Sequence, residues 1–131
     1  MTGVADTRLL LTLEFPPSEE SGRKAAGLVE REIAGRLIAP SIVLAEFVKI
    51  AGARMGEDVA TTRLRQLRER GMRTEALGER EALVAGGLLL SHHDVPTADA
   101  LIASFVKTGA GEYVVTDDPH YKILGVKTKW F

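Results

Sequence analysis

Four acidic positions in this sequence have the residue types and the spacing of a metal site. Each follows a predicted strand or lies in the first turns of a predicted helix; they are Asp6, Glu46, Asp99 and Asp118, with Asp117 beside the last. Ligands of open α/β sheets bind at the carboxyl ends of the strands, so these side chains can converge on one edge. Carboxylates gathered there repel one another unless cations intervene, and oxygen ligands without His or Cys favour Mg²⁺ or Mn²⁺. Such a site typically acts on phosphate esters.

The last third of the chain predicts a helix and a strand that position two of these acids. A helix begins at Pro96, and apolar residues recur along it with helical spacing: Ala98, Leu101, Ile102 and Phe105. After a break at residues 109–111, the run Tyr113–Val115 is too short for a helix and is typical of a buried strand. Asp99 therefore borders the apolar face of the helix, and Asp118 follows the end of the strand.

The N-terminal part predicts the elements around the other two acids. We expect a short strand at Thr2–Ala5, a helix over the following residues to Phe15, and a second helix from Ser18 to about Ala34. A second short strand, Leu37–Ala39, precedes a helix opened by Pro40. The apolar face of that helix is predicted as Val43, Phe47, Ile50 and Ala51.

The remaining segments continue the alternation of helices and strands. Glu57–Arg70 and Glu79–His92 have helical patterns, Met72–Leu77 allows a short strand between them, and Val126–Phe131 reads as a terminal strand. There is no repeat, linker or low-complexity segment. The pattern predicts an α/β domain with a mostly parallel sheet.

Composition sets the outer limits on function. The 131 residues are 45% hydrophobic, which suits a single domain over residues 1–131. With 17 basic and 18 acidic residues, bulk charge does not indicate a nucleic-acid or membrane-surface protein. The absence of cysteine excludes disulfides, thiolate zinc sites and cysteine nucleophiles. No apolar run approaches the roughly 18 residues of a membrane span, and no signal peptide is evident, so we expect a cytoplasmic protein with no membrane role.

Four motifs in order give the chain a resemblance to a known family. They are A-D-T near the start, A-P-S-I-V-L-A-E in the first third, P-T-A-D-A-L-I-A-S, and V-V-T-D-D-P-H-Y near the end. This set resembles the PIN domain family of metal-dependent ribonucleases, particularly the VapC toxins of prokaryotic toxin-antitoxin pairs. The resemblance implies a three-layer α/β/α fold with a mostly parallel central sheet. It also implies an endoribonuclease that leaves a 5′-phosphate and a 3′-hydroxyl.

The resemblance also implies roles for individual residues. The ligands of Mg²⁺ or Mn²⁺ would be Asp6, Glu46, Asp99 and Asp118, with Asp117 as an auxiliary acid. Thr7 and Thr116 would be hydroxyls that orient the carboxylates. Arg8 departs from the small polar residue that the family often has after its first Asp-Thr, and an arginine there can contact substrate phosphate or pair with a site acid. The implied partners are an RNA substrate, a small antitoxin protein and a second copy of the chain in a homodimer.

Several features also have other interpretations. Each acid, taken alone, can be a helix cap, a solvated side chain or a turn residue. His92-His93-Asp94 invites a metal-phosphohydrolase reading, but only one further histidine is present, so the pair is predicted to end a helix. Arg63, Arg65 and Arg68 are either a solvated helix face or a contact for the RNA backbone. The competing hypothesis for the whole chain is a non-catalytic binding module whose acids hold a structural cation or a partner's arginine.

Overall fold

The computed structural model describes residues 1–131 as five strands and seven helices. The strands are β1 (Gly3–Ala5), β2 (Leu37–Pro40), β3 (Arg73–Glu75), β4 (Tyr113–Val115) and β5 (Thr128–Lys129). The helices are α1 (Thr7–Glu14), α2 (Glu19–Gly35), α3 (Ser41–Met55), α4 (Glu57–Arg70), α5 (Glu79–Ser91), α6 (Thr97–Lys107) and α7 (His120–Ile123). The predicted alternation of strands and helices is confirmed.

All five strands form one parallel sheet in the order β3-β2-β1-β4-β5. The central strand β1 pairs with β2 on one side and with β4 on the other, in a register that places Ala5 beside Val115. Because the strands are parallel, their carboxyl ends meet at one edge of the sheet. The residues that follow β1 and β4, including Asp6 and Asp118, therefore start at neighbouring positions on that edge.

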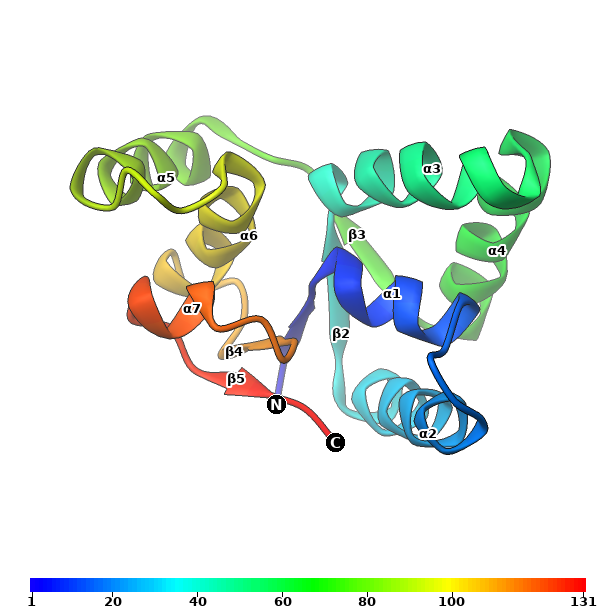
Figure 1. The fold of residues 1–131 in the computed structure, drawn as a ribbon. Helices are drawn as coiled ribbons and strands as arrows, with labels where there is room; N and C mark the ends of the chain where they lie inside the picture. The colour runs from blue at the N-terminus through cyan, green and yellow to red at the C-terminus, as the bar shows by residue number, and fades with distance from the viewer.

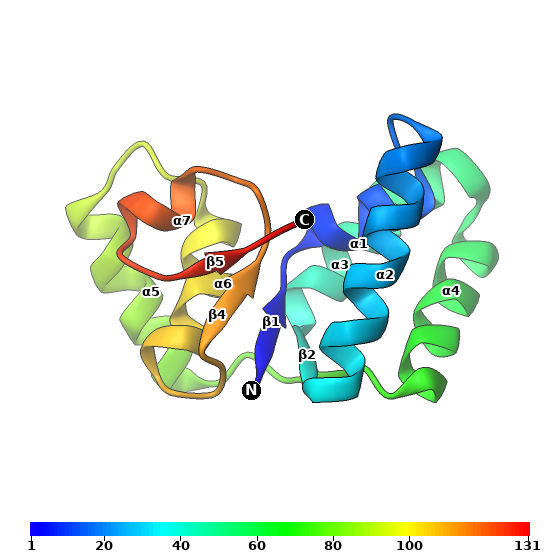
Figure 2. The same cartoon turned by 90° about the horizontal axis from the view of Figure 1, so that it is seen from below.

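Helices cover both sides of this sheet, so the predicted α/β/α architecture is confirmed. Figure 1 shows α5, α6 and α7 on one side of β1 and α1 to α4 on the other, and the view from below in Figure 2 shows the same division. α6 packs against β1, β4, α3 and α5, and α3 packs against α1 and α4. The two groups of helices meet at the carboxyl edge of the sheet through α3 and α6.

The core is one cluster of 26 buried residues that includes the apolar residues of β1, β2 and β4. Two predicted apolar faces need correction. Ile50 is 42% exposed, because only Val43, Phe47 and Ala51 of α3 turn inward. On α6, Leu101 is half-buried, whereas Ala100, Ala103 and Ser104 are buried with Ile102 and Phe105. The reason is that α6 is enclosed by the sheet, α3 and α5 on several sides, so its buried surface is wider than one apolar stripe.

Some predicted boundaries also move. The C-terminal strand spans Thr128–Lys129 rather than Val126–Phe131, because only these residues pair with β4. The short strand proposed within Met72–Leu77 is present as β3. None of the helices combines the length and the hydropathy that a membrane span requires.

Candidate metal-binding acidic site

Asp6 is a buried carboxylate at the end of the central strand. It is 4% exposed and occupies the N-cap position of α1 in extended backbone conformation, yet its side chain makes no capping hydrogen bond. Its Oδ2 instead accepts a hydrogen bond of 2.7 Å from Thr116 Oγ1, which follows the neighbouring strand β4. Asp6 is thus directed toward the next strand end, and the helix-cap reading does not account for its position.

Thr116 connects the two strand ends. Its hydroxyl donates to Asp6, and its Oγ1 accepts from the backbone N–H of Asp118 at 3.0 Å. Thr116 is itself buried, so both bonds are shielded from water. A single hydroxyl therefore sets the orientation of one site acid and the backbone position of another.

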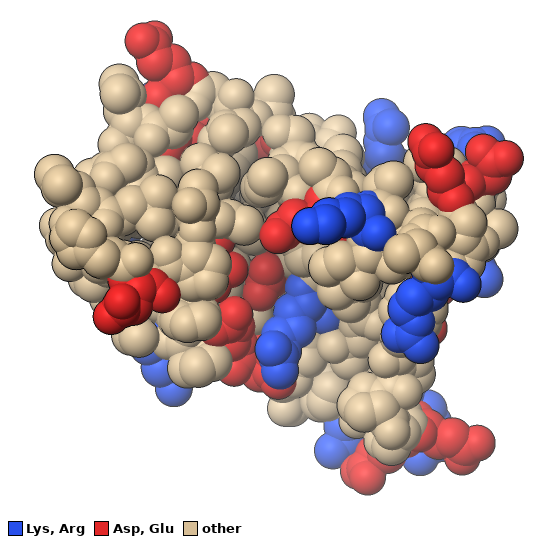
Figure 3. All heavy atoms as spheres, turned by 45° about the horizontal axis from the view of Figure 1, so that its top comes forward, with Lys and Arg blue, Asp and Glu red and all other residues tan.

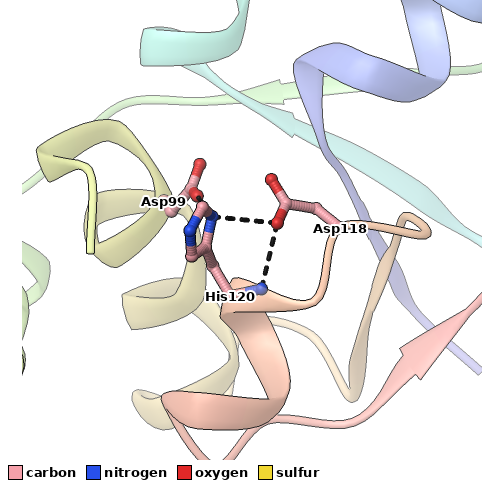
Figure 4. Close-up of side chains that lie close together, drawn as sticks. All are labelled: Asp99, Asp118 and His120. Carbon is pink, nitrogen blue, oxygen red and sulfur yellow. Dashed lines mark hydrogen bonds and ion pairs between the residues drawn. The ribbon is translucent and has the colours of Figure 1, made fainter. Parts of the chain in front are cut away.

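Asp99, Asp118 and His120 form the tightest group of potential metal ligands. One ligand atom from each residue lies within 4.8 Å of the other two. His120 Nδ1 lies 2.9 Å from Asp118 Oδ1 and 3.0 Å from Asp99 Oδ2, as the close-up in Figure 4 shows. These contacts have the distances of hydrogen bonds but not their angles, so His120 Nδ1 and Asp99 Oδ2 are both buried without a hydrogen-bond partner.

The position of His120 depends on the turn that precedes α7. Asp118 Oδ1 accepts a hydrogen bond of 2.9 Å from the backbone N–H of His120, which fixes the Asp-Pro-His turn. The turn directs the imidazole back between the two carboxylates. The sequence reasoning assigned no site role to His120, although its spacing of two residues from Asp118 was a usable signal. The structure thus places a ring nitrogen beside the carboxylate oxygens on which the sequence prediction was based.

The electrostatics of the site favour protonation of Asp6 and Asp99. Burial raises the pKa of Asp6. Burial also raises the pKa of Asp99 from its ordinary 3.8 to about 6, with further increases from the charges of Asp118 and Asp6 and a partial offset from His120. Tyr121 is fully buried beneath these residues, with its hydroxyl 3.5 Å from Asp99 Oδ1. Burial and the nearby carboxylates raise the pKa of Tyr121 far above its usual range, so it remains a proton donor.

Glu46 approaches the same region from α3. Its Oε1 accepts a hydrogen bond of 2.6 Å from the Thr7 hydroxyl, at the start of α1. Glu46 is half-buried and lies outside the tight group of ligand atoms. Thr7 and Thr116 each contact a different acid, so α1, α3 and the ends of β1 and β4 are linked around the site.

Asp117 and Asp118 point in different directions. Asp117 forms an ion pair with Arg8, with 2.5 Å between its Oδ1 and Arg8 Nε, and both side chains are partly exposed. Asp118 faces Asp99 and His120 instead. Of the two alternatives for Arg8, the structure has the pairing with an acid, and Asp117 is thereby turned away from the other carboxylates.

The arginines of α4 do not join the acidic group. α4 lies beyond α3, on the side away from α6 and α7 (Figure 1). Arg63 pairs with Glu14 at 3.6 Å, whereas Arg65 and Arg68 border a hollow of about 650 Å³ between α4 and β3. This hollow is larger than any other, but no buried carboxylate lines it. The acids at the carboxyl edge of the sheet therefore remain the candidate metal site. Figure 3 shows acids along the depression between the two halves of the molecule, and most basic side chains on the half formed by α1 to α4.

The His92-His93-Asp94 motif ends α5, as predicted. His92 follows the last residue of the helix, and its Nδ1 donates to the carbonyl oxygen of Leu88 at 3.0 Å. These residues are not among the potential metal ligands of the tight group.

Comparison with known protein families identifies the class to which this site belongs. The PIN domain family matches residues 4–127, which is almost the entire chain. The chain belongs to the PIN domain family. This match confirms the resemblance to the PIN domain family that the four sequence motifs indicated.

Solved structures with the same fold include toxins of VapBC complexes. VapBC2 of Rickettsia felis, bound to a DNA fragment from its promoter, has a TM-score of 0.79 and 15% identity, covering 99% of this chain and 98% of that one. VapC20 of Mycobacterium tuberculosis, a toxin that cleaves the sarcin-ricin loop, has a TM-score of 0.78 and 16% identity, with 96% of each chain covered. FitAcB of Neisseria gonorrhoeae has a TM-score of 0.71 and 19% identity, covering 98% and 96%. Comparison with curated protein sequences gives no match.

Proposed function

We propose that this chain is an endoribonuclease that requires Mg²⁺ or Mn²⁺ and cleaves RNA to a 5′-phosphate and a 3′-hydroxyl. The observation that carries the proposal is the group of Asp6, Asp99 and Asp118 at the carboxyl edge of the sheet, where His120 is the one basic side chain in contact. Asp6 is buried and the other two are half-buried, and carboxylates with so little compensation are unfavourable for folding, which is typical of sites that bind a cation. Membership of the PIN domain family supports the same conclusion.

The donor atoms fit a divalent cation. Asp99 Oδ2 is buried and accepts no hydrogen bond, so it retains a lone pair for a ligand bond. Asp118 and His120 place an oxygen and a nitrogen nearby, and Mn²⁺ accepts such a mixed set more readily than Mg²⁺ does. Asp99 and Asp118 would hold the cation, with Asp6 and Glu46 beside them and Asp117 in a minor role through its pair with Arg8.

The protein's own groups would orient the reaction. When bound, the cation supplies neutralisation of the phosphoryl oxygens and a water of lowered pKa. Thr116 holds Asp6 and the backbone of Asp118 in place, and Tyr121 stays protonated beside Asp99 as a hydrogen-bond donor. Glu46, which Thr7 orients, stands on the facing helix and would position the attacking water.

Basic side chains on the α1–α4 half would hold the RNA backbone. Arg8 lies at the rim of the acids, while Arg65 and Arg68 have no carboxylate partner and Arg63 has a long contact of 3.6 Å to Glu14. Guanidinium groups without a partner bind phosphates well, and binding through them weakens as salt is added. The acids would then cut the strand that these arginines hold.

We also propose a protein partner of the antitoxin type. The acids offer a binding site for a partner's arginine. Asp99 and Asp118 share His120 as their one basic neighbour, so a guanidinium group would form charge-assisted hydrogen bonds with them. Several proteins of the same fold were crystallised in toxin-antitoxin complexes. If a small basic protein encoded beside this chain binds it, the complex should lose the thermal stabilisation by Mn²⁺.

A homodimer is the proposed assembly state. Leu83 and Leu90 are seven residues apart and lie on the same face of α5; they are 70% and 75% exposed, which is unusual for side chains of this size. The α2 segment Val29–Ile33 does not offer a similar surface, because Val29 is completely buried. Light scattering at tens of micromolar should give twice the chain mass, and Leu83→Glu should give the monomer mass.

The test of the nuclease is cleavage of a panel of structured and single-stranded RNAs with Mn²⁺, with Mg²⁺ and with a chelator. Cleavage should require the cation and should disappear in Asp118→Asn. If no RNA is cleaved while Mn²⁺ still raises the melting temperature, the chain is the non-catalytic binding module instead.

A further inference from the structure

The connection between α5 and α6 carries a motif that the proposed metal site does not use. His92, His93, Asp94, Val95, His120 and Ile123 line an open cavity of about 440 Å³. The chain has three histidines, and all of them lie in this wall. His120 belongs to both places, because its Nδ1 lies 2.9 Å from Asp118 while the residue also borders the cavity. A molecule in the cavity is therefore next to the acids.

The cavity wall is preformed. The backbone N–H of Val95 donates to the carbonyl oxygen of His92 at 3.2 Å, which closes the turn, and the Val95 side chain is buried in the core. The hydrogen bond from His92 Nδ1 to Leu88 fixes the orientation of that ring. The volume of the cavity lies within the range of about 300–1,000 Å³ that is common for small-ligand pockets. A ligand would thus bind without ordering the loop first.

The chemistry of the wall suits a base rather than a phosphate. No lysine or arginine lines the cavity, and Asp94 adds a carboxylate that repels anions. Imidazole rings stack on nucleobases, and Ile123, 57% exposed, offers an apolar surface for the same purpose. The carboxylate of Asp94 accepts hydrogen bonds from amino groups, which adenine, guanine and cytosine carry and uracil lacks.

We propose that this cavity receives an unpaired RNA base adjacent to the phosphate that is cut at the acids, with a preference against uracil. The inference rests on the proposed nuclease function for the identity of the ligand. The arginines on one half of the molecule would bind the RNA backbone, and the histidine cavity on the other half would bind a base. The substrate is then a single-stranded or looped segment, since a paired base is not free to enter.

The test is equilibrium binding of labelled single-stranded oligoadenylate and oligouridylate, measured by fluorescence anisotropy with a chelator present to prevent cleavage. Ile123→Ala and His93→Ala should each weaken oligoadenylate binding about tenfold, because each removes a surface on which the base would pack. Val59→Ala, an exposed apolar side chain on α4, is the matched control and should bind as the wild type does. Asp94→Ala should reduce the difference between the two RNAs.

The outcomes separate this proposal from the nuclease proposal. If Ile123→Ala binds oligoadenylate as tightly as the wild type, the cavity is not a base site, even when the wild type cleaves RNA. If no RNA is cleaved but Ile123→Ala weakens binding while Val59→Ala does not, the result supports the base-site proposal and contradicts the nuclease proposal. A wild type that binds neither oligonucleotide overturns the base site.

Discussion

Each end of the sheet holds one buried carboxylate, Glu32 or Asp6, but only Glu32 has a basic partner of its own. At the amino end, Glu32 of α2 is 3% exposed; it accepts a hydrogen bond of 2.5 Å from the Tyr113 hydroxyl and lies 2.9 Å from Lys129 Nζ. At the carboxyl end, Asp6 and Asp99 share their surroundings with Asp118, and their pKa values are raised. A buried acid with its own partners contributes to the fold, whereas a group of acids that repel one another indicates a binding site.

The amino-end network also joins distant parts of the chain. Glu32 lies on α2, Tyr113 begins β4, and Lys129 ends β5, so three elements meet at one carboxylate. Gly3 leaves room for this network, because a Cβ there would lie 2.5 Å from Glu32 Oε1 and 3.0 Å from side-chain atoms of Tyr113 and Val115. This end is therefore expected to respond to mutation through stability, and the acidic end through activity. Four experiments test the contrast, from the largest expected effect to the smallest.

Asp118→Asn should reduce RNA cleavage by at least about a hundredfold, because the amide keeps the shape of the side chain but weakens cation binding. RNA affinity should remain the same or improve, since binding depends on basic side chains and is opposed by nearby negative charge. Single-turnover cleavage and anisotropy measure the two quantities separately. Asp117→Asn is the matched neighbour and should lose far less activity; equal losses would show that the two acids share the role.

Glu32→Ala should lower the free energy of unfolding by about 3 kcal/mol, because the Tyr113 hydroxyl and Lys129 lose their buried partner. Thermal unfolding should then occur roughly 10 °C lower. Glu30→Ala is the control, since Glu30 is an exposed acid on the same helix with a 3.8 Å contact to Arg70, and it should change little. A loss of cleavage by Glu32→Ala below its melting temperature would break the proposed contrast between the two ends.

Asp99→Asn should raise the melting temperature in metal-free buffer by a few degrees, because it removes one of the repelling charges. The same variant should lose most of the further increase that Mn²⁺ produces in the wild type through binding to the folded state. Differential scanning fluorimetry with a Mn²⁺ titration gives both values. A variant that is less stable than the wild type without metal would mean that Asp99 serves the fold, as Glu32 does.

The pH dependence should run in opposite directions with and without the cation. Folding raises the pKa of Asp99 to about 6, so the folded state binds this proton more tightly and its stability decreases as pH rises from about 4 through 6. Cation binding needs the ionised carboxylate, so the increase in melting temperature by Mn²⁺ should be small at pH 5 and larger at pH 7.5. A Mn²⁺ effect that is independent of pH over this range would place the cation away from Asp99.

Much of the site was predictable because its acids follow local signals. Short apolar runs end at Ala5 and Val115, and Pro40 and Pro96 precede α3 and α6, so the positions of the acids relative to strand ends could be derived before any contact was known. The resemblance of the last motif to the PIN domain family likewise implied Asp118 as a ligand, with Asp117 as an auxiliary acid. These features depend only on neighbours within a few residues.

The sequence by itself determined the alternation of strands and helices, the parallel sheet and the acids at its carboxyl edge, since apolar periodicity and turn residues act locally. Only the tertiary structure decided that His120 lies between Asp99 and Asp118, that Arg8 pairs with Asp117, and that Ile50 is exposed. It also decided that Glu32 is buried with partners from β4 and β5. The physical reason is that these features depend on side chains up to 109 positions apart, Arg8 and Asp117 among them, which meet only when the helices pack on the sheet.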